Sequence, residues 1–231
     1  MATAKPPLAA PKGGAVSHSG RPVVTDVRNP SPIYLASRSP RRHELLAQLG
    51  IPFDEIKLRT APGRHRDVVE EALDGEPALH YVERIARTKA STGWKRMQER
   101  ALAMRPVLGA DTEVVLDDVI FGKPQDAPAA RAMLAKLSGR VHDVISAVAL
   151  RWNDDVEVAV SVSQVTFRKL TSGEIERYIE TKEPFDKAGG YAIQGRAAVF
   201  VTRLEGSYSG VMGLPLAETA ALLARVGRSV L

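Results

Sequence analysis

The sequence predicts an α/β fold: a mixed, twisted sheet with flanking helices and two lobes around a cleft. Strand-like apolar runs alternate with helical patterns in the first half of the chain. Two long runs of alternating apolar and polar residues, 140–151 and 156–168, flank Asn153–Asp155, which predicts an antiparallel hairpin. Because strand–helix alternation and hairpins occur in one chain, the mixed sheet is the arrangement that fits both.

The first expected element is the apolar run IYLA at 33–36, which predicts a strand. Ser39 suits the N-cap of the helix that follows, Pro40 suits its first turn, and Gly50 suits its end. FDEI at 53–56 predicts a second strand. The chain therefore runs from a strand through a loop into a helix whose first turn is basic.

A long helix is expected at 78–100, with an apolar face that includes Val82 and Ile85. Lys89 lies four residues after Ile85, on that same face. The later elements follow from turn and capping signals. They are a strand and hairpin at 106–124 turning near Asp117–Asp118, a helix from Asp126 to Gly139, a helix opened by Thr171 and Glu174, a Gly-rich loop at 184–196, a strand at 197–204 and a last helix from about residue 216.

Composition and charge narrow the class of protein. The 231 residues include no cysteine, which excludes disulfides and thiolate catalysis and suits the cytoplasm, where we expect the protein. Residues 1–30 are rich in Pro, Gly, Ala and Ser, and predict a disordered extension before a domain at 31–231. The N-terminus lacks the apolar core of a secretory signal, and no apolar run is long enough to span a bilayer.

The net charge of +5 invites a nucleic-acid-binding interpretation. Four basic residues against one acid in 1–30 supply +3 of that charge, and no Lys/Arg block or RNA-binding aromatic motif follows. We therefore expect neither nucleic acid nor a membrane as partner. The sequence leaves the oligomeric state open, with a homodimer among the possibilities.

The segment SRSPRR, with Ser39, Arg41 and Arg42, is the first candidate site. A helix N-terminus attracts anions, and arginine forks match phosphate oxygens, so the segment could bind a polyphosphate. A capped surface helix with solvated arginines is an equally good interpretation of this motif alone. Lys89, similarly, either reaches the edge of its helix or points into a cleft.

Three further motifs carry polar groups. Asp111 in GADT is expected at the end of a buried strand, before a turn, which is where α/β folds place catalytic carboxylates. There it could activate water or hold a metal, or it could cap the turn. Lys123 in FGKP follows a glycine that permits close approach to a ligand, although alone it is a solvated lysine in a turn. Lys187 and Gln194 lie in a Gly-rich loop, where the amide of Gln194 could complement a pyrimidine edge. No P-loop, dinucleotide-binding glycine motif, zinc-protease motif or nucleophile elbow is present.

These motifs follow one another in a definite order. LASRSPRRHELLAQLG, YVERIARTKA, VLGADTEVVLDDVIFGKP, MLAKLSGRVHDVISAVAL, EPFDKAGGYAIQG and GSYSGVMGLPLAET together resemble the Maf family over about residues 33–226. The resemblance implies an α/β fold with two lobes around a deep cleft. It also implies a metal-dependent nucleoside triphosphate pyrophosphatase, which cuts between the α and β phosphates.

The resemblance assigns roles residue by residue. It implies Asp111 as the proton acceptor, and places Arg42, Lys89 and Lys123 around the phosphates, with Ser39 and Lys187 in the same motifs. Arg41, Thr112 and Gln194 resemble the branch that acts on dTTP and UTP, with a housecleaning role on modified pyrimidine nucleotides. A non-catalytic, nucleotide-binding regulator of division and septum formation is the alternative.

The metal site is where the chain departs from the family pattern. The resemblance implies Mg²⁺ or Mn²⁺ held partly by Glu70, within DVVEEALDGE at 67–76. Val69 stands where an acid is common, and an insertion-like APGRHR precedes the segment. Despite these departures, Glu70 matches the family's glutamate best, and it is the metal ligand that we expect.

Overall fold

The computed structural model describes residues 31–60 and 66–230. Within this part of the chain, seven strands form one mixed sheet in the order β2-β1-β3-β5-β6-β7, with β4 paired to β3. β1 pairs in parallel with β2 and β3, and the other pairs are antiparallel. The mixed α/β prediction is confirmed. The extension expected at 1–30 lies outside the described residues.

The elements have the following bounds. The strands are β1 (Ile33–Leu35), β2 (Phe53–Glu55), β3 (Val107–Leu116), β4 (Val119–Phe121), β5 (Val141–Trp152), β6 (Asp155–Phe167) and β7 (Val201–Glu205). The helices are α1 (Pro40–Gln48), α2 (Ala78–Glu99), α3 (Ala127–Leu137), α4 (Ser172–Glu180), α5 (Tyr208–Met212) and α6 (Leu216–Arg225). Three short 3₁₀ helices, η1 (Glu183–Asp186), η2 (Ala188–Gly190) and η3 (Arg196–Phe200), connect α4 to β7.

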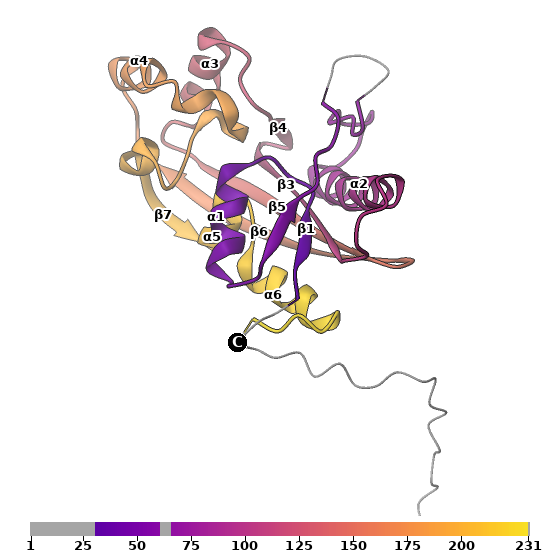
Figure 1. The fold of residues 1–231 in the computed structure, drawn as a ribbon. Coiled ribbons are helices and arrows are strands. Elements are labelled where there is room, and N and C mark those ends of the chain that lie inside the picture. The colour runs from indigo at the N-terminus through magenta and orange to yellow at the C-terminus, as the bar shows by residue number, and fades with distance from the viewer. Residues whose placement is uncertain (1–30, 61–65, 231) are drawn as a thin grey trace, which may run out of the picture.

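Side-chain alternation along β3 and β5 divides the core between the two faces of the sheet. α2 packs against odd-numbered residues of these strands, such as Val115 and Ala147. α1 and α6 pack against even-numbered residues, such as Leu108 and Val148, on the opposite face. Figure 1 shows α2 on one side of the strands and α1 with α5 on the other. Neighbouring residues of β3 therefore serve different sides of the molecule.

Most local signals in the sequence act as expected. Thr171 and Glu174 form both bonds of a capping box, and Asp126 accepts a hydrogen bond from the backbone N–H of Ala129 at the start of α3. Gly50 follows α1 with a φ of +67°, which glycine adopts without strain. Ser39 occupies the N-cap of α1, yet its side chain makes no capping hydrogen bond.

Two predictions about strands are wrong in detail. The strand expected at 197–204 begins only at Val201, because Ala197 and Phe200 both enter the core at a spacing of three, which a 3₁₀ turn satisfies and a strand does not. Asp111, expected at a strand end before a turn, lies in the middle of β3. The turn comes later, at Asp117–Asp118, where both residues have positive φ.

Candidate functional site

An unpaired stretch of β3 opens the space for the site. On one side β3 pairs with β5 along most of its length. On the other side it pairs with β1 at Val107 and Leu108, and with β4 from Val114 onward. No described strand pairs with that edge between residues 109 and 113. Asp111 lies at the centre of this gap, because the pairing with β1 ends before it and the pairing with β4 begins after it.

A cavity of about 720 Å³ lies at this gap and reaches both faces of the sheet. All ten residues singled out in the sequence line it. They are Ser39, Arg41, Arg42, Glu70, Lys89, Asp111, Thr112, Lys123, Lys187 and Gln194. The fold therefore brings together groups from motifs up to about 150 residues apart in the chain.

Lys89 and Asp111 form the buried centre of the α2 side of the cavity. The Lys89 ammonium lies 2.7 Å from Asp111 Oδ1 and 2.7 Å from Glu70 Oε1. Lys89 is 9% exposed and Asp111 is 5% exposed. Gly109 makes this approach possible, because a Cβ there would lie 2.5 Å from the backbone nitrogen of Ala90. Lys89 thus points into the cavity and not to the rim of its helix.

Glu113 is a site residue that the sequence analysis missed. It lines the cavity two residues after Asp111, on the same face of β3. Burial, reinforced by the charge of Asp111, raises the pKa of Glu113 to about 8. Glu113 Oε2 and Asp111 Oδ2 are buried without a hydrogen-bond partner among the described residues. The period of two along GADTEV was the signal that could have found it.

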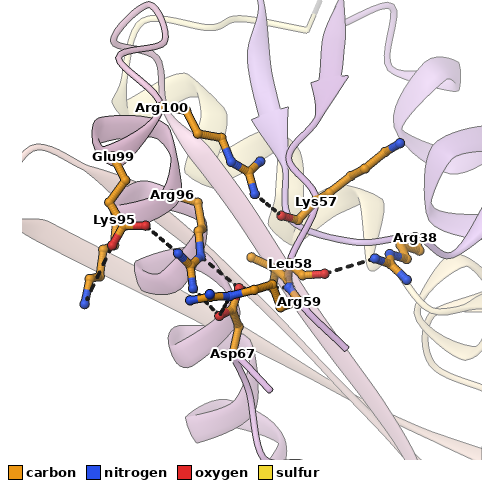
Figure 2. Close-up of polar contacts among 9 residues, drawn as sticks. All are labelled: Arg38, Lys57, Leu58, Arg59, Asp67, Lys95, Arg96, Glu99 and Arg100. Carbon is orange, nitrogen blue, oxygen red and sulfur yellow. Dashed lines mark hydrogen bonds and ion pairs between the residues drawn. The ribbon is translucent and has the colours of Figure 1, made fainter. Parts of the chain in front are cut away.

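The segment that carries Glu70 is fixed to α2 by Asp67. Its carboxylate accepts hydrogen bonds from the backbone N–H of Arg59, at 2.8 Å, and from Nε of Arg96 on α2, at 2.9 Å. Figure 2 shows Asp67 between these two arginines. Although burial opposes the shift, the charge of Lys89 and its hydrogen bond lower the pKa of Glu70. Glu70 is therefore held as a carboxylate beside Lys89.

Arg42 dominates the opposite face of the gap. Its Nε donates to the carbonyl of Gly213 at 2.8 Å, and a terminal nitrogen donates to Thr112 Oγ1 at 3.3 Å. Thr112 Oγ1 lies 2.8 Å from Ser146 Oγ, which donates to the carbonyl of Gly210. Burial lowers the pKa of Arg42 from its usual value. Because these acceptors are neutral, they fix the guanidinium in place without neutralising its charge.

The rim of the cavity holds Arg41 and Lys187, both in contact with Asp186. Arg41 donates to Asp186 Oδ2 at 2.9 Å and to the Asp186 carbonyl at 3.3 Å. The Lys187 ammonium contacts Asp186 Oδ1 and donates to the Glu183 carbonyl at 2.6 Å. Two of the five cations expected to face the substrate are thus linked through one acid.

Lys123 and Gln194 line the cavity from two further segments. Lys123 follows β4, and its charge contributes, after that of Lys89, to the lowered pKa of Glu70. Gln194 is exposed, between η2 and η3. Within the described ranges, no group of three or more His, Cys, Asp or Glu residues is placed to hold a metal ion.

The fold and the cavity define an α/β protein with a basic cleft, because cations from four segments line the cavity that holds the buried carboxylate of Asp111. The chain belongs to the Maf family, whose model, described as Maf-like protein, matches residues 32–226. The resemblance stated from the motifs is confirmed.

Curated relatives are similar over most of their length. The dTTP/UTP pyrophosphatase of Nitrosospira multiformis is 56% identical over 83% of this chain and 92% of its own. That of Chromobacterium violaceum is 51% identical over 86% of this chain and 96% of its own. That of Aromatoleum aromaticum is 52% identical over 84% and 95%. The ten expected site residues, which lie between positions 39 and 194, all fall within the range that the family model covers.

Solved structures are more distant. The Staphylococcus aureus Ham1 protein aligns with a TM-score of 0.39 and 13% identity, over 59% of this chain and 72% of its own. Protein VC0702 from Vibrio cholerae aligns with a TM-score of 0.41 and 11% identity, over 87% and 99%. These values are too low to bear on function. Among the described residues, no helix has the length and apolar character needed to cross a membrane.

Proposed function

We propose that the protein hydrolyses dTTP and UTP to the nucleoside monophosphate and pyrophosphate. The relatives of 51–56% identity carry this activity in their names. The observation that carries the proposal is the buried carboxylate of Asp111, which lines a cavity shared with Arg42, Lys89 and Lys123. The non-catalytic regulator is not favoured, because those relatives are named as enzymes.

The cations divide the triphosphate between them in this proposal. Arg42 has a charge that its neutral acceptors leave uncompensated, so it suits phosphate oxygens directly. Lys89 and Lys123 add charge from the α2 side and from the end of β4. Ser39 and Lys187 complete the phosphate contacts. Placing fixed cations where pyrophosphate develops charge is the general way in which enzymes stabilise phosphoryl-transfer transition states.

Asp111 acts as the general base. Lys89 holds Oδ1, whereas Oδ2 has no partner among the described residues and can take a proton. In the hydrolytic step, the oxygen of a water molecule bonds to the α-phosphorus and its proton passes to Asp111 Oδ2. The bond from the α-phosphorus to the bridging oxygen breaks, and pyrophosphate leaves.

A divalent cation, Mg²⁺ or Mn²⁺, fits the acids of the cavity. Glu113 Oε2 is buried and without a partner among the described residues, and Glu70 lies on the same side. Mg²⁺ is commonly bound by one or two carboxylates together with substrate phosphates, so a preformed three-acid cluster is not required. Glu70 and Glu113 would hold the ion. Once bound, it would polarise phosphoryl oxygens and neutralise their charge.

Base selection is assigned to Arg41, Thr112 and Gln194. Gln194 can present both a donor and an acceptor to a pyrimidine edge, and Arg41 lies at the rim with Asp186. Thr112 contacts Arg42 and Ser146, so its influence on the substrate passes through Arg42. We place this activity in the cytoplasm, as part of the removal of modified pyrimidine nucleotides.

A pyrophosphate-release assay across the nucleoside triphosphates tests the proposal. Purified protein should release pyrophosphate from dTTP and UTP faster than from CTP or the purine nucleotides, and chelation of divalent metal should stop the reaction. Release of inorganic phosphate in place of pyrophosphate would rule out cleavage between the α and β phosphates. Binding of dTTP with no turnover in Mg²⁺ or Mn²⁺ would favour the non-catalytic alternative.

A further inference from the structure

Asp186 is an acid at the rim of the cavity that the proposed reaction does not use. It ends η1, and each of its two carboxylate oxygens contacts a different cation, Arg41 or Lys187. Burial opposes the shift, but the hydrogen bonds from Lys187 and Arg41 lower the pKa of Asp186. The contact with Arg41 joins residues 145 positions apart, and so links α1 to the loop after α4.

The platform that carries Asp186 is itself well fixed. Glu183, at the start of η1, accepts hydrogen bonds from the Tyr178 hydroxyl at 2.9 Å and from the backbone N–H of Arg196 at 3.1 Å. Pro184 is buried beside it. An arginine paired with Asp186 is therefore held against a rigid segment, and its orientation is set by the fold.

Two adjacent arginines on α1 differ in the partners they meet. Arg42 donates to carbonyl and hydroxyl groups, which leave its positive charge in place. Arg41 donates to a carboxylate, which compensates its charge. A compensated guanidinium is a poorer ligand for a triphosphate, yet it still has N–H groups to offer. Two of its five N–H groups are used by Asp186, which leaves the others for an uncharged acceptor.

We propose that Asp186 is a positioning residue for base selection: it holds Arg41 so that its remaining donors address the uncharged carbonyl of a pyrimidine and not the phosphates. The assignment rests on the proposed hydrolysis of dTTP and UTP. Without Asp186, no carboxylate compensates the charge of Arg41, and its side chain is free to turn toward the phosphates. Discrimination between bases then weakens. Arg42, Lys89, Lys123 and Asp111 have no hydrogen bond or ion pair with Asp186, and Lys187 keeps its bond to the Glu183 carbonyl.

The chain supplies a matched control. Asp54 forms an ion pair with Arg105 at 2.6 Å, and its side chain is 65% exposed, against 61% for Asp186. The arginines are also alike, at 27% exposed for Arg105 and 21% for Arg41. Asp54 and Arg105 do not line the cavity. Asp54→Asn therefore removes a comparable ion pair without touching the site.

The test compares Asp186→Asn, Asp186→Glu, Asp54→Asn and the unaltered enzyme by kcat and KM for dTTP and CTP. We expect Asp186→Asn to lower the dTTP-to-CTP ratio of kcat/KM about tenfold, the scale of one well-placed hydrogen bond, with kcat for dTTP changed less than threefold. Asp186→Glu should recover part of the ratio, and Asp54→Asn should leave it unchanged. Gln194→Ala gives a benchmark for lost base discrimination.

Two results would overturn the assignment. An unchanged ratio in Asp186→Asn would show that Arg41 needs no help from Asp186. An equal loss for dTTP and CTP would make Asp186 a structural clasp. Binding of non-hydrolysable α,β-methylene analogues of dTTP and CTP gives the same ratio without turnover. If the unaltered enzyme hydrolyses no triphosphate at all, the proposed function fails, and that result is distinct from an unchanged ratio in an active enzyme.

Discussion

The two faces of β3 at the gap treat charge in opposite ways. On the face toward α2, Lys89 lies between the carboxylates of Asp111 and Glu70, so each charge meets another. On the opposite face, Arg42 donates to the carbonyl of Gly213 and the hydroxyl of Thr112, which are neutral. One residue along the strand, from Asp111 to Thr112, is enough to pass from one environment to the other.

The difference in charge pairing suits the two faces to different functions, proton transfer on one and anion binding on the other. A buried set of paired charges adds little stability, because the cost of desolvation offsets the attraction between the charges. Under the proposed function, the paired charges on the α2 face have a chemical role, since a carboxylate there takes a proton from water. A fixed and uncompensated arginine, in contrast, suits the binding of an anion. Substitutions on the α2 face should therefore change kcat, and those on the Arg42 face should change KM.

Asp111→Asn, on the α2 face, should cause the largest loss of kcat. The amide cannot accept a proton in the reaction, so kcat for dTTP should fall roughly 10²–10⁴-fold, the usual scale for loss of a general base. KM should change little, because Arg42 is untouched. Steady-state pyrophosphate release measures both constants. Asp118→Asn, in the exposed β3–β4 turn, is the control. Turnover near that of the unaltered enzyme would exclude Asp111 as the base.

His142 lies on the same side of the sheet as Arg42, and burial keeps its side chain neutral. Burial lowers the pKa of His142 to about 4 from 6.5, and its Nε2 pairs with the Tyr191 hydroxyl at 2.8 Å. Between these pH values the unfolded chain binds more protons, so stability should fall as pH drops from about 6.5 to 4. The loss approaches about 3 kcal/mol.

His142→Gln removes this titration while keeping a group that can hydrogen-bond to Tyr191. Denaturant unfolding at a series of pH values from 7 to 4 measures the effect. The unaltered protein should lose more stability than the variant across this range, although the variant starts lower. Parallel stability curves for the two proteins would mean that the pKa of His142 is the same in the folded and the unfolded chain.

The sequence predicted the members of the site better than their arrangement. Periodicity placed Lys89 on a buried face, and each motif supplied at least one residue of the cavity. Asp111 was expected at a strand end because the sequence does not show that β1 stops short and β4 starts late. Glu113 was not predicted, because it lies one residue beyond the GADT motif, which ends at Thr112. The pairing of Arg41 with Asp186 spans 145 positions, and no local pattern encodes it.

Glu113→Gln sharpens the comparison by testing the metal on the α2 face. An amide oxygen is a weaker ligand for Mn²⁺ than a carboxylate, so the Kd for Mn²⁺ should rise about tenfold, which is the lower end of the loss seen when metal-site support is removed. Electron paramagnetic resonance of free Mn²⁺, without nucleotide, measures binding directly. Glu205→Gln, at an exposed ion pair with Arg203, is the control. An unchanged Kd would remove Glu113 from the metal site.

Thr112→Val should give the smallest effect, and it probes the Arg42 face alone. The substitution removes one acceptor of Arg42 and a partner of Ser146, while the Gly213 carbonyl still fixes Arg42 at 2.8 Å. Loss of one hydrogen bond of about 1 kcal/mol corresponds to a rise in KM for dTTP of about fivefold, with kcat preserved. Thr112→Ser, which keeps the hydroxyl, should behave as the unaltered enzyme. A fall in kcat at constant KM would mean that the two faces are not separate, because Thr112 would then act on the reacting phosphorus through Asp111.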